Sequence, residues 1–148
     1  MPRTLILGLG NPLRSDDAVA WHVIDALQDL ARDPNVSLKS VRQLAPELAE
    51  EVSQSEMVIF VDAAEATPQG RVSVNPVDET APPHTRFSHS LNPASLISLA
   101  RTLYGKAPAK AFLVTIAAAS FDISEELSEP VARAVPAAAA AIRGLLSA

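Results

Sequence analysis

Three short apolar runs constrain the fold of this chain more than any other feature. They cover residues 4–9, 57–61 and 111–116, and each is apolar at nearly every position. A strand of this kind is buried on both faces, which is typical of the centre of a parallel sheet covered by helices. We therefore expect these runs to be the central strands.

The segments around these runs alternate between helical and strand-like patterns. Apolar residues recur at helical spacing in four segments, residues 18–31, 45–54, 94–105 and 127–148. Residues 36–44 and 71–77 alternate between apolar and polar side chains, so we expect strands near the sheet edges, and Pro76 limits the pairing of the second. Strands that alternate with helices predict a three-layer α/β/α sandwich with a mostly parallel sheet of about five strands, in one domain spanning residues 1–148.

Several residues predict where helices begin and end. A helix that starts near Asn92 should end at Gly105, which suits a left-handed C-terminal cap. Ser128 should cap the last helix, with Pro130 in its first turn. Pro136 should kink or split that helix.

Composition excludes several classes of function. The net charge is −5 and the basic residues are scattered, which argues against a nucleic-acid partner. The chain has no cysteine, so disulfides, thiolate metal sites and cysteine nucleophiles are excluded. No apolar segment approaches the roughly 20 residues of a membrane span. We expect no signal peptide, no membrane association and a cytoplasmic protein.

Aspartates follow two of the predicted central strands. Asp16 and Asp17 come after the first strand, and Asp62 ends the run at residues 57–61. In an open α/β sheet the working crevice lies beyond the carboxyl ends of the strands, so these carboxylates should converge there. In the alternative interpretation, Asp16 and Asp17 only stabilise a helix start that Ser15 caps. A capping Asp16 would tolerate replacement by Asn.

The long loop at residues 78–93 carries two histidines. It contains three prolines and no periodicity, and loops of this length in compact domains are more often functional than not. We expect His84 at the loop surface and His22 on the polar side of its helix, whereas His89 lies just before a helix. Two carboxylates and an imidazole around one crevice suit a divalent first-row metal with open coordination positions. The residues alone name neither the metal nor its role, catalysis or recognition.

Four segments in the same order resemble the hydrogenase maturation proteases, the endopeptidases that trim the large subunit of nickel-iron hydrogenases. The resemblance spans the chain from about Leu5 to Val135. It includes the first loop, a strand-to-strand unit, the histidine loop with its helix, and a segment near the C-terminus: LGLGNPLRSDDAVA, QLAPELAEEVSQSEMVIFVDAA, FSHSLNPASLISLARTLYGKAP and SFDISEELSEPVARAV.

The resemblance implies a function and a set of site residues. It implies an endopeptidase that removes the C-terminal extension of a hydrogenase large-subunit precursor after nickel insertion. It further implies that Asp17, Asp62 and His89 are catalytic and bind nickel, which the precursor carries and the free protein does not hold tightly. We expect the protein to act as a monomer.

The chain departs from the family pattern at several positions. Ala18, Ala20 and Glu126 stand where the family usually has glycine. Gln43 stands where some members have an aspartate. Because alanine disfavours positive φ, these changes predict altered loops and leave open a catalytically degenerate, nickel-binding maturation factor.

A peptidyl-tRNA hydrolase-like esterase is a further alternative, because that family also begins with a strand and GLGNP. The acidic stretch RSDDAV replaces the histidine-containing stretch of that family.

Overall fold

A computed structural model describes residues 3–79, 91–119 and 121–147. A five-stranded sheet has the order β2-β1-β3-β5-β4. Its strands are β1 (Thr4–Leu9), β2 (Val36–Val41), β3 (Met57–Glu65), β4 (Val72–Pro76) and β5 (Lys110–Ala118). β2, β1, β3 and β5 are parallel, and β4 pairs antiparallel with β5. The predicted mostly parallel sheet is confirmed.

The position of each strand follows from its sequence pattern. The three apolar runs form β1, β3 and β5, which each have a neighbour on both sides. The two alternating segments form the edge strands β2 and β4, as predicted. Pro76 pairs with Phe112 in the last register position of β4, where a residue without an N–H is tolerated because β4 is the outermost strand of the described sheet.

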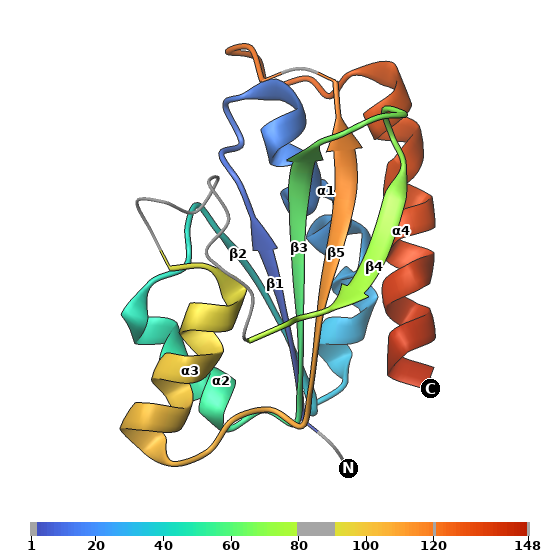
Figure 1. Cartoon of the computed structure of the whole chain (residues 1–148). Coiled ribbons are helices and arrows are strands. Elements are labelled where there is room, and N and C mark those ends of the chain that lie inside the picture. The colour runs from blue at the N-terminus through green and yellow to red at the C-terminus, as the bar shows by residue number, and fades with distance from the viewer. Residues whose placement is uncertain (1–2, 80–90, 120, 148) are drawn as a thin grey trace.

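Helices cover both faces of the sheet (Figure 1). The α-helices are α1 (Val19–Ala26), α2 (Ala49–Ser53), α3 (Pro93–Tyr104) and α4 (Glu129–Ser147). Short 3₁₀ helices are η1 (Ser15–Ala18), η2 (Gln28–Arg32) and η3 (Pro46–Leu48). Helices α1 and α4 pack on one face, and α2 and α3 pack on the other. The predicted three-layer α/β/α sandwich is confirmed.

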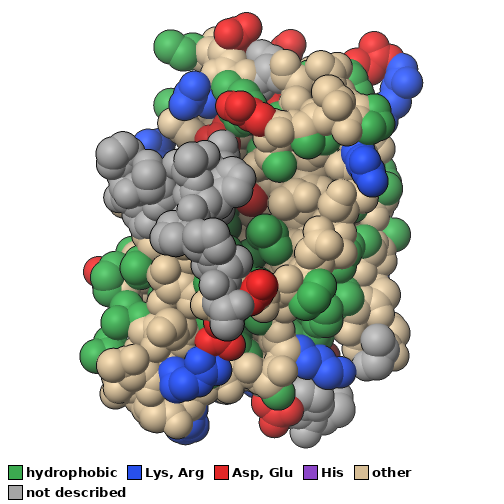
Figure 2. All heavy atoms as spheres, in the orientation of Figure 1, with side chains coloured by type: hydrophobic (Ala, Val, Ile, Leu, Met, Phe, Trp, Pro, Cys, Tyr) green, Lys and Arg blue, Asp and Glu red, His purple; other side chains and the backbone are tan. Residues whose placement is uncertain are grey.

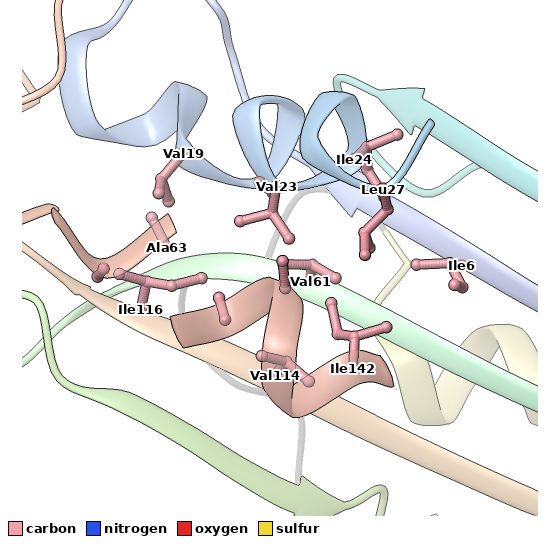
Figure 3. Close-up of a cluster of buried hydrophobic side chains, with 14 of the residues drawn as sticks. Ile6, Val19, Val23, Ile24, Leu27, Val61, Ala63, Val114, Ile116 and Ile142 are labelled. Atoms are coloured by element: carbon pink, nitrogen blue, oxygen red, sulfur yellow. The ribbon is translucent and has the colours of Figure 1, made fainter. Parts of the chain in front are cut away.

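Each face of the sheet has its own apolar core. On one face, Val23 of α1 and Ile142 of α4 meet Val61 and Val114 of the central strands (Figure 3). On the other face, a second cluster surrounds Phe60 beneath α2 and α3. Since neighbouring residues of a strand point to opposite faces, the continuous apolar runs supply both cores.

The ends of α3 are as predicted. The Asn92 side chain caps its start, since Oδ1 accepts a hydrogen bond from the backbone N–H of Ser95 at 2.7 Å. Gly105 ends it with φ +70°, in the left-handed conformation that glycine adopts without steric cost.

One helical prediction needs correction, and one of two alternatives for another is excluded. The helix predicted at residues 18–31 is divided into α1 and the 3₁₀ helix η2. By contrast, α4 is one continuous element, so Pro136 does not split it. Because Pro136 has no N–H, the carbonyl of Ala132 lacks its usual helical donor. Both residues are exposed, so water can solvate that carbonyl. Within the described part of the chain, no helix is long and apolar enough to cross a membrane.

Candidate functional site

The loop between β1 and η1 depends on two glycines. A Cβ on Gly8 would lie 2.6 Å from Cγ1 of Ile24 and 3.0 Å from the carbonyl oxygen of Ala20. Gly10 has φ +148°, and a Cβ there would lie 1.8 Å from the carbonyl oxygen of Asp17. Only glycine therefore lets the helical segment lie this close to the end of β1.

Asp17 is buried in the turn of η1. The residue is 7% exposed, and Oδ2 accepts a hydrogen bond from the backbone N–H of Asn11 at 2.8 Å. Its own backbone N–H donates to the carbonyl of Arg14 at 3.0 Å. One hydrogen bond to the side chain of Asp17 and one from its backbone thus orient this carboxylate within the loop.

Asp16, the preceding residue, has different partners. It is 0% exposed, and its carboxylate accepts hydrogen bonds from the N–H of Ala119 and from both the N–H and the hydroxyl of Ser128. The interpretation in which Ser15 caps the helix is wrong. Arg14 occupies the N-cap position of η1, no side chain caps it, and the Ser15 hydroxyl donates to the carbonyl of Glu126 at 2.9 Å.

Asp62 lies near the carboxyl end of β3 and is 2% exposed. Its Oδ1 accepts a hydrogen bond from the N–H of Ala63 at 2.8 Å. Val61 and Ala63 belong to the core beneath α1 and α4, so Asp62 points to the opposite face, where it is in register with Thr115 of β5. Helix η1 contacts β3. The two elements that carry Asp17 and Asp62 therefore meet, and the convergence of their carboxylates stays a prediction.

The histidines differ in what the structure describes. His22 is exposed on α1, as predicted. His84 and His89 lie outside the described residues. The described chain resumes at Leu91, which forms an isolated bridge with Leu44 beyond the end of β2. Across residues 3–79, 91–119 and 121–147, no group of three or more His, Cys, Asp or Glu side chains is arranged to hold a metal ion. The third predicted ligand is thus not placed.

Sequence reasoning missed the contribution of Ser128 to this region. Ser128 was expected only to cap α4, and its carbonyl does accept the N–H of Ala132 at 2.9 Å. Its hydroxyl, however, donates to Oδ2 of Asp16 at 2.8 Å. No local signal could reveal this bond, because its partners are 112 residues apart.

The departures from the family pattern leave the backbone unstrained. Ala18 has φ −86°, and Ala20 lies within α1. Among the described non-glycine residues, only Ser15 has a positive φ, at +45°. Glu126 therefore has a negative φ and does not need the conformation that favours glycine. None of these replacements strains the backbone, and the expectation that the loops differ in shape from those of the family stays a prediction.

Comparison with known proteins supports the fold. No protein-family model and no curated protein sequence matches the chain. Among solved structures, it is similar to the hydrogenase maturating endopeptidase HybD from E. coli, with a TM-score of 0.79 and 21% identity over 98% of this chain and 92% of that chain. A hydrogenase 2 maturation peptidase from Thaumarchaeota archaeon SCGC_AB-539-E09 gives 0.73 and 25%, over 97% of each chain.

A further similar structure is the [NiFe] hydrogenase maturation protease HycI from Thermococcus kodakarensis KOD1. It has a TM-score of 0.78 and 23% identity over 99% of this chain and 94% of that chain. The similarity extends over nearly the whole length of each of these proteins. The chain therefore has the fold of the hydrogenase maturation endopeptidases.

Proposed function

We propose that this protein is an endopeptidase that removes the C-terminal extension of a nickel-iron hydrogenase large-subunit precursor after nickel insertion. The observation that carries the proposal is the burial of Asp17 and Asp62 on two elements in contact at the carboxyl edge of this fold. Carboxylates buried at this edge are suited to binding and catalysis more than to stability. The similarity of the fold to that of named maturation endopeptidases supports this assignment.

Asp17, Asp62 and His89 would receive the nickel that the precursor carries. Carboxylate oxygens and an imidazole nitrogen are suitable donors for this ion, so the residues fit it. They are nonetheless a modest set, because the chain has no cysteine to supply a thiolate. The free protein should therefore bind nickel weakly, and the metal would identify a precursor that is ready for cleavage.

Cleavage of a peptide bond by water needs a group that accepts a proton. The carboxylate of Asp17 or Asp62 can serve as the general base, and activation of the water by the precursor's metal is the alternative. The burial of both side chains keeps them away from bulk water, which strengthens their interaction with a bound substrate.

The alternative of a degenerate, nickel-binding factor rested on Ala18, Ala20 and Glu126. The backbone at these positions has ordinary conformations, so it shows no strain that would favour this alternative. An esterase that acts on tRNA would need a clustered basic surface. On the face shown in Figure 2, Lys and Arg side chains lie apart from one another. We further propose that the protein acts in the cytoplasm as a monomer.

A processing assay with two precursor forms tests the function. The purified protein, dialysed against a chelator, is incubated with the nickel-loaded precursor and with the same precursor lacking nickel. Mass spectrometry of the large subunit should show loss of the C-terminal extension only from the nickel-loaded form. Elemental analysis should find little metal in the free protein.

Two results would contradict the proposal. Binding of nickel-loaded precursor without cleavage would favour the non-catalytic factor. Tightly bound stoichiometric metal, with activity lost on chelation and restored by zinc, would indicate an ordinary metallopeptidase.

A further inference from the structure

The first loop is hydrogen bonded to the segment between β5 and α4, here called the closing segment (residues 121–128). The N–H of Ser15 donates to the carbonyl of Ser124 at 2.7 Å, and the N–H of Ser124 donates to the carbonyl of Leu13 at 3.0 Å. The Ser15 hydroxyl reaches the carbonyl of Glu126. The first loop and the closing segment are thus joined by hydrogen bonds next to Asp17 in the chain.

The Asp16 carboxylate links the residue that follows β5 to the residue that precedes α4, which is the last of the closing segment. Its Oδ2 accepts the N–H of Ala119, just after β5, at 2.7 Å. Its Oδ1 accepts the N–H of Ser128, just before α4, at 2.7 Å, and Oδ2 also accepts the Ser128 hydroxyl at 2.8 Å. A buried carboxylate is costly unless it is hydrogen bonded, and these donors stabilise it.

The turn that holds Asp16 also holds Asp17. Ser15 keeps φ +45°, a conformation that a non-glycine residue retains only where its surroundings enforce it. Here the enforcing contacts are its hydrogen bonds to the closing segment. The orientation of Asp17 therefore depends on the attachment of the closing segment.

From this geometry we propose that Asp16 is a positioning residue. Its carboxylate ties the closing segment to the first loop and so orients Asp17 for the precursor. This inference rests on the proposed function. It also changes the expectation that Asn can replace Asp16. Asparagine has one oxygen, so in either orientation its NH₂ group would face the N–H of Ala119 or of Ser128.

Asp16→Asn tests the proposal against a destabilised control far from the loop, Ile142→Ala in the core beneath α4. Both are assayed with nickel-loaded precursor at a temperature where circular dichroism shows them fully folded. Asp16→Asn should lower kcat by roughly 10- to 100-fold, as expected for a displaced reacting group, whereas Ile142→Ala should stay within about twofold of wild type.

Amide hydrogen exchange gives a readout that does not depend on activity. In Asp16→Asn, the N–H groups of Ala119 and Ser128 should exchange faster, while those of β3 keep their protection. If Asp16→Asn does not fold, Ser128→Ala carries the same test, because it removes one donor and retains the backbone N–H. It should raise exchange at Ala119 and lower kcat more than Ile142→Ala does.

Equal kcat values in Asp16→Asn and Ile142→Ala would overturn the positioning role, as would unchanged exchange at Ala119 and Ser128. An inactive wild-type protein would instead refute the proposed function. The exchange rates would then decide by themselves whether Asp16 ties the two segments.

Discussion

The backbone N–H of Asn11 donates a hydrogen bond to Oδ2 of Asp17 at 2.8 Å, across the turn that joins β1 to η1. This bond orients the carboxylate without requiring its negative charge, because an amide oxygen can accept the same N–H. Replacement of Asp17 by Asn therefore separates the charge of the side chain from its structural role.

Asp17→Asn should fold normally and lose activity. Processing of nickel-loaded precursor should fall by roughly two orders of magnitude, because the site loses a charged ligand or general base. The melting temperature should change little. Asp62→Asn should behave in the same way, and His22→Ala, at an exposed position of α1, should match wild type. A fully active Asp17→Asn protein would remove this residue from the proposed site.

The two loop histidines should differ in their effect on processing. His89→Ala should abolish processing because it removes the proposed imidazole ligand, whereas His84→Ala should retain it. The same gel or mass-spectrometric assay of the large subunit measures both. Retained activity in His89→Ala together with loss in His84→Ala would show that the other histidine is the ligand.

Gly10→Ala should be strongly destabilising. The new Cβ would lie 1.8 Å from the carbonyl oxygen of Asp17 at φ +148°, which predicts a loss of roughly 2–5 kcal/mol in the free energy of unfolding. Gly144→Ala is the matched control, since its Cβ meets no atom within 4 Å in the exposed part of α4. It should stabilise by about 0.5–1 kcal/mol. Urea denaturation measures both, and equal stabilities would contradict the described loop geometry.

The ion pair between Asp29 and Arg143 predicts that the free energy of unfolding depends slightly on pH in the acid range. The hydrogen bond from Arg143 to Asp29, at 2.7 Å, lowers the pKa of Asp29 below 3.8. Because the folded pKa is the lower one, the stabilisation is present above pH 3.8 and is lost as the pH falls through the lowered pKa.

Thermal melts of wild type and Asp29→Asn test this dependence. They should differ slightly at pH 7, since both partners are solvent-exposed, and converge at low pH. A difference that grows on acidification would contradict the assigned direction of the pKa shift.

The sequence by itself determined the layers of the fold and which strands lie at the centre of its sheet. A strand buried on both faces requires apolar residues at nearly every position, so residues 4–9, 57–61 and 111–116 could be assigned to the centre of the sheet. Pro76 marked an edge strand because it lacks an N–H donor. Asn92 and Gly105 marked the ends of α3 through local backbone chemistry. All of these signals act within one element.

Only the tertiary structure decided which partner each polar side chain has. Asp16 and Asp17 are adjacent carboxylates in the same local sequence pattern. Asp17 nevertheless accepts the N–H of Asn11, whereas Asp16 accepts the N–H of Ser128, 112 residues away. The antiparallel direction of β4 likewise depends on its pairing with β5. Such contacts join segments distant in sequence, and local propensity and periodicity carry no information about them.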